Sequence, residues 1–305
     1  MNLRNKIFLT IGAVIRSLPR IRGKVRFGLF SYKMLDLRKE PFVINASLFE
    51  ETLTFRLNLN CAHERMAYLM GQYESETSAF LTELFKGGSF LDVGANIGLI
   101  TLPFVERTKG KTSSLKPYVY AVEALPINYR ALCENIELNS FGTFVAPLNV
   151  GLGEQEAEVF IEIEGNDSRA TGTANIKPSD HNFTKIPLHI KSVDQMVEEG
   201  QLPADISLIK IDTDGYDYEV LKGARKLLAK NRCLVFAELS EHCMKWHGYG
   251  IKEVVRYLKT VDYETWQMTK KKPMKFKRYE GPNDYGETCL LVPLENTGEL
   301  EKYLL

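Results

Sequence analysis

A glycine-rich turn after a short apolar run is the first feature of this sequence that could do chemistry. Residues 90–98 read Phe-Leu-Asp-Val-Gly-Ala-Asn-Ile-Gly, and helix-compatible residues 99–105 follow. Glycines in such a turn let the backbone bend sharply and let a ligand approach it closely. The pattern predicts a strand with Asp92 at its carboxyl end, and open α/β sheets bind small molecules at that edge. We therefore expect a ligand site here.

An acidic residue follows the next predicted strand. Residues 118–122 read Tyr-Val-Tyr-Ala-Val, and Glu123 comes directly after them. A carboxylate at this position can accept hydrogen bonds from both hydroxyls of a ribose. The glycine turn and the acid at the end of the following strand together indicate a cofactor that contains a nucleoside.

The spacing of the glycines narrows the choice of cofactor. A dinucleotide site has the pattern G-x-G-x-x-G, which seats a pyrophosphate on a helix amino end. The corresponding positions here are Gly94, Asn96 and Leu99, so two of the three glycines are missing. S-adenosylmethionine carries no phosphate. Backbone amides and Asn96 suit its methionyl end, and Glu123 suits its ribose. The turn predicts this cofactor, and the alternative is a strand–helix turn that binds nothing.

Residues 206–215 form the second chemically suggestive stretch, an apolar strand followed by the acidic turn Asp-Thr-Asp-Gly. Strand alternation places Lys210 and Asp212 on the same side. Asp212 should emerge at the same sheet edge as Asp92 and Glu123, where a carboxylate could accept the proton of a hydroxyl nucleophile. Two alternatives stay open: Asp212 caps the next helix, or it forms a structural ion pair with Lys210.

Two further residues are candidate bases, and the metal alternatives are weaker. Glu238 lies near the end of the next buried strand and His242 follows that strand, and the ordinary pKa of histidine suits proton transfer. A calcium loop that began at Asp212 would need glycine at its sixth position and an acid at its twelfth, but Asp217 and Gly223 stand there. Magnesium held by Asp212 and Glu238 is conceivable from the ligand types. We predict no metal.

The composition is that of an ordinary globular protein. The chain has 305 residues, zero formal net charge, 44% hydrophobic and 26% charged residues, which suits one large α/β domain with a small appendage. The charge balance predicts no nucleic-acid partner. Five widely spaced cysteines form no C-x-x-C pair, so neither a zinc site nor a disulfide framework is indicated. A reducing compartment fits best, and we expect a cytoplasmic location.

The amino-terminal segment departs from this average. Residues 1–40 contain ten Lys or Arg and two acids, and their apolar run at residues 7–15 is too short to span a bilayer. One interpretation is a basic amphipathic segment that rests on an anionic membrane near a lipid-linked substrate, which would make the protein peripheral to that membrane. The other is a solvated or domain-packed helix with a charged face, which we favour because charge runs usually face water.

Hydrophobic patterning predicts strands that alternate with helices, and hence a mostly parallel sheet covered on both faces. A β-hairpin over residues 42–49 and 53–59 precedes the main domain, and the polar residues 165–185 are interpreted as a substrate lid. Strands are expected at residues 90–93, 118–122, 143–150, 156–164, 206–211, 233–239, 263–268 and 288–293, and helices near residues 74–85, 126–139, 216–229 and 251–260.

These residues resemble the FkbM family of S-adenosylmethionine-dependent methyltransferases over roughly residues 70–240. The motifs D-V-G-A-N-I-G at residues 92–98 and I-K-I-D-T-D-G at residues 209–215 carry most of the resemblance. Its other parts are Gly71-Gln72-Tyr73-Glu74, Glu123 with Pro126 and Asn128, Asn149-Val150-Gly151, Val193-Asp194 and Glu219-Val220-Leu221-Lys222-Gly223-Ala224. Two positions depart from the family pattern: Ala124 follows Glu123 where proline is frequent, and Asp214 stands where glutamate is frequent.

The resemblance implies a class I methyltransferase (Rossmann-like) fold: a doubly wound, mostly parallel seven-stranded sheet. Residues 1–70 would form a basic helix and β-hairpin extension, and residues 71–305 the methyltransferase domain. From their places at strand ends, we predict Asp212 as the catalytic residue, with Glu238 or His242 as alternatives. The resemblance implies that the cofactor residues are Asp92, Gly94, Asn96, Gly98, Glu123, Asn149 and Val150. We also predict cofactor contact for Glu74, Ala124 and Asp212.

The functional hypothesis is transfer of a methyl group to a hydroxyl of a saccharide, glycan or related small metabolite. Two other classes of protein are retained as alternatives. One is an NAD-dependent oxidoreductase, against which the missing glycines count. The other is a non-catalytic protein that keeps the methyltransferase fold and pairs with a glycosyltransferase.

Overall fold

The computed structural model describes residues 2–19, 23–37, 41–110, 117–164, 183–270, 274–281 and 287–305. The predicted lid at residues 165–185 lies almost entirely outside the described residues.

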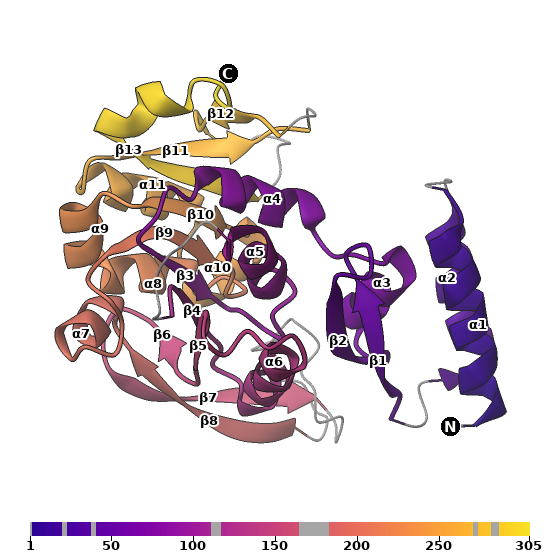
Figure 1. Cartoon of the computed structure of the whole chain (residues 1–305). Coiled ribbons are helices and arrows are strands. Elements are labelled where there is room, and N and C mark those ends of the chain that lie inside the picture. Colours follow the sequence, from indigo (N-terminus) through magenta and orange to yellow (C-terminus); the bar gives the residue numbers. More distant parts are fainter. Residues whose placement is uncertain are drawn as a thin grey trace.

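An eight-stranded sheet forms the centre of the main body (Figure 1). In spatial order its strands are β12 (Phe276–Arg278), β11 (Tyr263–Met268), β13 (Thr288–Pro293), β10 (Leu234–Glu238), β9 (Ile206–Ile211), β3 (Ser89–Val93), β4 (Val119–Val122) and β5 (Val145–Leu148). The five strands from β10 to β5 are parallel, whereas β13 runs antiparallel to both of its neighbours.

The α/β class is as predicted, but the seven-stranded, mostly parallel sheet needs correction. β12 is an eighth strand of three residues, too short to show a hydrophobic period, and it pairs antiparallel with β11. The predicted strand at residues 156–164 belongs elsewhere. It is β7 (Ala157–Glu164), which forms a separate three-stranded sheet with β8 (Phe183–Lys191) and β6 (Gly151–Leu152).

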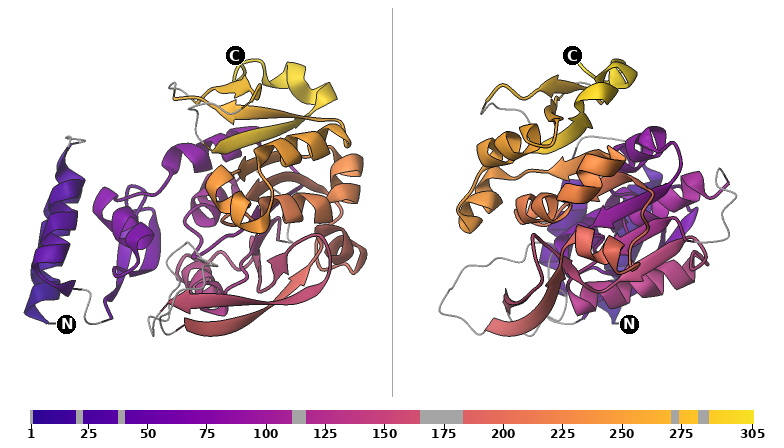
Figure 2. Two further views of the ribbon diagram at one scale, coloured as in Figure 1. Left: turned by 180° about the vertical axis from the view of Figure 1, so that it is seen from behind. Right: turned by 90° about the vertical axis from the view of Figure 1, so that its left-hand side faces the viewer.

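Helices cover both faces of the large sheet, and alternate strand residues feed two separate apolar cores (Figure 2). On β3, Phe90 belongs to one core and Leu91 to the other; on β9, Leu208 and Ile209 divide in the same way. The helices of the main body are α4 (Ser75–Leu84), α5 (Thr101–Thr108), α6 (Pro126–Leu138), α7 (Val193–Glu198), α8 (Asp217–Gly223), α9 (Arg225–Asn231), α10 (Glu241–Met244) and α11 (Ile251–Lys259), with 3-10 turns at Lys245–His247 and Leu294–Leu300.

The described residues up to Met70 form an amino-terminal lobe beside the large sheet (Figure 1), and their buried apolar side chains belong to the same core as those on one face of that sheet. The lobe contains α1 (Leu3–Ser17), α2 (Lys24–Met34), the predicted hairpin of β1 (Val43–Leu48) and β2 (Leu53–Asn58), and α3 (Ala62–Met70). None of the helices in the described parts of the chain has the length and apolar character needed to span a bilayer.

Two asparagines, Asn135 in α6 and Asn139 directly after it, bind the edge of β2 that does not pair with β1 and join the lobe to the main body. Asn139 accepts from the Thr54 amide at 2.9 Å and donates to the Thr54 carbonyl at 2.7 Å. Asn135 accepts from the Arg56 amide at 2.7 Å and donates to the Ile97 carbonyl at 2.9 Å. Asn135 therefore connects the hairpin directly to the glycine turn. The domain boundary after residue 70 stays a prediction.

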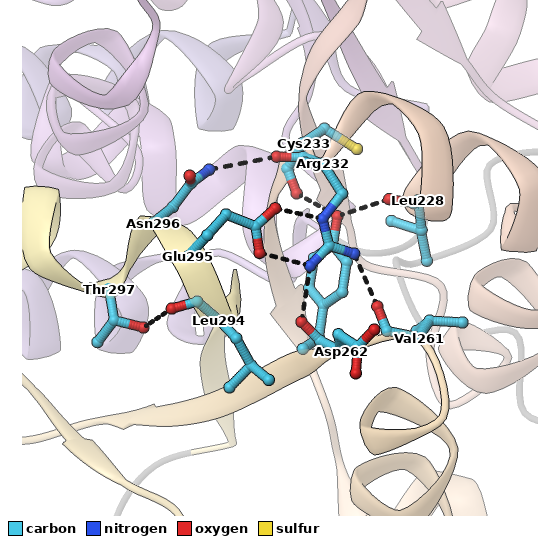
Figure 3. A network of polar contacts seen from close by, with 10 residues as sticks. Leu228, Arg232, Cys233, Val261, Asp262, Leu294, Glu295, Asn296 and Thr297 are labelled. Atoms are coloured by element: carbon cyan, nitrogen blue, oxygen red, sulfur yellow. Dashed lines mark hydrogen bonds and ion pairs between the residues drawn. The ribbon is translucent and has the colours of Figure 1, made fainter.

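A polar network closes the amino-terminal edge of β10 and β11 (Figure 3). The Arg232 guanidinium binds both oxygens of Glu295, at 2.5 and 2.7 Å. It also donates to the carbonyls of Val261 at 2.8 Å and Asp262 at 2.9 Å. The planar guanidinium fork matches this bidentate arrangement, so the network joins the starts of two strands to the turn that follows β13.

Candidate cofactor and active site

A cavity of about 390 Å³ lies at the carboxyl edge of β3, β4 and β9. Its floor is formed by the turns that follow these strands, and β7 and β8 contribute an apolar wall. The wall residues are Val159, Phe160, Ile161, Leu188 and Ile190. A polar floor opposite an apolar wall suits a ligand that combines hydroxyls, charges and a flat ring.

Glu123 sits in the floor with both carboxylate oxygens held by backbone amides. The Asn96 amide donates to Oε2 and the Leu125 amide to Oε1, each at 2.9 Å. An ionised carboxylate has about four acceptor positions, so both oxygens keep acceptor capacity for ribose hydroxyls. The residue is 7% exposed, and this burial raises the pKa of Glu123 to about 7. The acid is thus fixed in orientation before any ligand arrives.

The glycine turn that begins at Gly94 packs against the acidic turn that begins at Asp212. Gly94 has φ +75°, and a Cβ atom there would lie 1.9 Å from the carbonyl oxygen of Asp212. Only glycine allows this approach. The amides of Gly94 and Ala95 both donate to the Val122 carbonyl at 2.9 Å. The close approach brings the turn after β3, the end of β4 and the start of the acidic turn into one floor.

Lys210 is buried under this floor. Its Nζ lies 3.3 Å from Asp92 Oδ1 and 3.5 Å from Asp212 Oδ2, and it donates to the Gly94 carbonyl at 3.0 Å. Thr101 holds the other Asp92 oxygen at 2.6 Å. Burial by itself lowers the pKa of Lys210, but Asp92 and Asp212 outweigh burial and the net shift is upward. Lys210 therefore stays charged and joins the two sequence motifs.

Further carboxylates crowd this edge. Burial first, and then Asp212, raise the pKa of Asp217 to about 7. Burial, Asp212 and Glu74 shift the pKa of Glu238 upward as well. Like charges that share a site with little water disfavour each other's ionisation. Among the described residues, Asp217 and Glu238 thus add to the two acids, Asp92 and Asp212, that the Lys210 ammonium contacts.

The residues expected to bind the cofactor divide into two groups. Those that line the cavity are Gly94, Asn96, Glu123, Ala124, Val150 and Asp212. Those that do not line it are Glu74, Asp92, Gly98 and Asn149. Asn149 instead donates to the carbonyls of Glu123 at 2.8 Å and Ala124 at 3.0 Å. A Cβ atom on Gly98 would lie 2.5 Å from the Leu102 side chain. Asp92, Gly98 and Asn149 thus support the floor from behind, and direct contact of all four residues with a cofactor stays a prediction.

Of the three candidate bases, only Asp212 lines the cavity. Glu238 and His242 do not line it, and the His242 ring packs against Trp246 with centroids 5.1 Å apart. Two other histidines do line it, His63 and His247. Burial lowers the pKa of His247, so this ring is neutral near pH 7.

Sequence reasoning did not single out His63, Tyr73 or Lys210 as site residues. His63 comes from α3 in the amino-terminal lobe, far in sequence from either motif, and no local pattern marks it. Tyr73 stands in the G-Q-Y-E segment and lines the cavity; burial, Glu74 and Asp212 raise its pKa. The sequence indicates Lys210 only as an ion-pair partner of Asp212, and its contact with Asp92 follows from the pairing of β3 with β9.

The fold is that of an α/β protein with a cavity at the carboxyl edge of its sheet, the edge at which open α/β sheets bind ligands. The chain belongs to the FkbM family of methyltransferases, because the profile of the methyltransferase FkbM domain matches residues 92–265, which is more than half of its length. The methyl donor of this family is S-adenosylmethionine.

Similar proteins include hexuronic acid methyltransferase AglP of Haloferax volcanii, which is 32% identical over 139 residues, or 45% of this chain and 50% of that protein. The chain thus spans about half of this relative. Among solved structures, methyltransferase FkbM from Methylobacillus flagellatus KT is similar with a TM-score of 0.45 and 16% identity, covering 95% of this chain and 59% of that one. TYW2 of M. jannaschii with AdoMet is similar with a TM-score of 0.43 and 15% identity, covering 83% and 86%.

Proposed function

We propose that this protein transfers a methyl group from S-adenosylmethionine to a hydroxyl of a saccharide or a related small molecule. The observation that carries the proposal is the position of Glu123, Asn96 and Asp212 on one cavity. The first two residues suit the nucleoside and methionyl parts of the donor. The third offers a carboxylate to an acceptor.

The polar groups of the cavity floor support binding of the donor. Glu123 would accept from the ribose hydroxyls, since its oxygens are already oriented by two backbone amides. Val150 and Ala124 line the cavity near it and offer apolar contact to a base. When bound, S-adenosylmethionine supplies an electrophilic methyl group on a sulfonium. No phosphate-binding glycine pattern is present, which disfavours the NAD-dependent alternative.

Asp212 would act on the acceptor. Its side chain is 43% exposed and faces the cavity, while its backbone is fixed against Gly94. A carboxylate in this position can orient an acceptor hydroxyl and take its proton as the oxygen attacks. Holding both reactants in one cavity supplies much of the acceleration. The sugar class of the acceptor is supported by the name of the Haloferax relative, whose acceptor is a hexuronic acid.

The test combines a binding and a turnover measurement. S-adenosylhomocysteine, but not NAD, should bind in calorimetry, and labelled methyl groups should pass from S-adenosylmethionine to a glycan fraction. Asp212→Asn should keep S-adenosylhomocysteine binding and lower kcat about 100-fold to 10,000-fold, the usual size of a general-base contribution.

His242→Asn and Glu238→Gln decide between the candidate bases. If either of these variants loses turnover while Asp212→Asn keeps it, the assignment of Asp212 is wrong. If no fraction accepts a methyl group although S-adenosylhomocysteine binds, the non-catalytic alternative is favoured.

A further inference from the structure

The outer faces of α1 and α2 carry a concentration of exposed apolar side chains. These two helices lie side by side at the edge of the molecule farthest from the large sheet, beyond α3 (Figures 1 and 2). Seven of the thirteen exposed large hydrophobic residues of the described chain belong to this helix pair and its connection. They are Leu3, Ile7, Val14, Leu18, Phe27, Phe30 and Met34. We call these seven residues the outer apolar face.

The fold fixes which side of each helix points outward. A Cβ atom on Gly12 of α1 would lie 2.4 Å from the Tyr68 ring, and one on Gly28 of α2 would lie 2.8 Å from Leu69. Both contacts are with α3, so each helix presses its glycine side onto that helix. The buried residues of α1 share this inner side, and Leu3, Ile7 and Val14 recur on the opposite side at helical spacing. On α2, Phe27, Phe30 and Met34 do the same.

The exposed apolar side chains favour the interpretation that the amino-terminal segment rests on a membrane over the interpretation that it is a solvated or packed helix. A merely solvated helix would present polar residues outward, whereas Phe30 is 59% and Met34 68% exposed. Two aromatic rings and several aliphatic chains on one outer face are unusual for a surface that meets only water.

Some Lys and Arg side chains of the two helices are hydrogen-bonded within the lobe, and others are exposed. Arg16 is used internally, since it donates to the Ser47 carbonyl at 2.9 Å and packs on Tyr68. Lys24 is also used internally, because it donates to the Ile15 and Leu18 carbonyls at the end of α1. Four other cations are exposed beside the outer apolar face and form no ion pair within the described part of the chain. They are Arg4, Lys6, Arg26 and Lys33.

We propose that the outer apolar face is a docking surface for an anionic phospholipid membrane, with its aromatic and aliphatic side chains in the interfacial layer and the four exposed cations on lipid headgroups. Apolar residues flanked by Lys and Arg are the composition of helices that lie in a membrane interface. A second copy of this chain is a poorer occupant. A two-fold contact would place the same cations against each other. The proposal concerns where the protein resides and is independent of its reaction.

The experiment is sedimentation of the full chain with vesicles of phosphatidylcholine alone or of phosphatidylcholine with phosphatidylglycerol. We expect binding to the anionic vesicles, weakened by added salt, and little binding to the neutral ones. Replacing the four exposed cations by glutamine should weaken binding about 100-fold or more, since each cation near an anionic surface contributes about fivefold.

The apolar variant is Phe27→Ser, Phe30→Ser, Met34→Ser, which should weaken binding about tenfold or more. Its matched control is Leu138→Ser, Leu294→Ser, which removes exposed apolar residues elsewhere and should leave vesicle binding unchanged. Circular dichroism checks that each variant is folded. The absence of binding to anionic vesicles would overturn the proposal, and so would equal loss in the control. Light scattering that shows a dimer dissociated by the apolar variant would assign the face to a second copy instead.

Discussion

The two edges of the large sheet each hold a cation in a polar network, and the two networks are built differently. At the amino-terminal edge, Arg232 meets one acid, Glu295, through two parallel hydrogen bonds and also binds two carbonyls. At the carboxyl edge, Lys210 meets two acids, Asp92 and Asp212, with longer contacts of 3.3 and 3.5 Å. The first network is balanced in charge, whereas the second contains more acids than cations.

The pKa shifts follow this difference. The Arg232 hydrogen bonds lower the pKa of Glu295 to about 2, so folding favours its ionised form. At the other edge, burial raises the pKa of Glu123 and of Asp217 to about 7, so folding favours their neutral forms. Perturbed acids of the second kind cluster where a protein uses its carboxyl groups. The amino-terminal edge is thus built for stability, whereas the carboxyl edge carries perturbed acids, of which Glu123 lines the cavity and Asp217 is buried behind it.

The largest expected effect comes from removing the cation of the carboxyl edge. Lys210→Met leaves the fully buried Asp92 carboxylate without its ammonium partner, and we expect a loss of about 3–5 kcal/mol in the free energy of unfolding, measured with urea. The double variant Asp92→Asn, Lys210→Met should recover part of this loss, because no charge is left buried. Unfolding of Lys210→Met at the wild-type urea concentration would show that Lys210 is dispensable.

A smaller effect is expected for Glu123→Gln, which should weaken binding of S-adenosylhomocysteine about 10-fold to 100-fold, because hydrogen bonds to a charged acceptor are lost. Wild-type affinity should rise as the pH increases through about 7, where Glu123 ionises and gains acceptor capacity. Calorimetry between pH 6 and pH 8, a range of about one unit on either side, checks this. A variant that kept the same pH dependence would assign the titration to another group.

The smallest effect is expected at the amino-terminal edge. Glu295 is about half exposed, so Glu295→Gln should cost only about 0.5–1 kcal/mol at neutral pH. The contribution of ionised Glu295 to the free energy of unfolding is present above the ordinary pKa of 4.5 and is lost as the pH falls toward 2. Glu123 and Asp217 have raised pKa values, so the pH dependence is reversed. Their contribution to the free energy of unfolding is present at low pH and is lost as the pH rises through about 7. Chemical unfolding across this pH range separates the two edges, and a cost of Glu295→Gln unchanged at low pH would contradict the assignment.

The sequence by itself determined the α/β class, the glycine turn and the identity of the acids at three strand ends. These features are local, because strand alternation and turn-forming glycines are set by neighbouring residues. Asp92, Glu123 and Asp212 could be placed at one sheet edge for the same reason, since parallel strands end together. The short strand β12 and the separate β7–β8 sheet could not be read in this way, because pairing partners decide them.

Only the tertiary structure decided which contacts these acids make and which of them line the cavity. Asp92 lies behind the cavity and holds Lys210, because the pairing of β3 with β9 aligns these two residues. His63 reaches the cavity only because the amino-terminal lobe packs beside the glycine turn, and His242 lies outside the cavity lining despite its place after a strand. The outward side of α1 was likewise set by Gly12 against Tyr68. Contacts between residues distant in sequence depend on the packing of whole elements, and no local pattern encodes them.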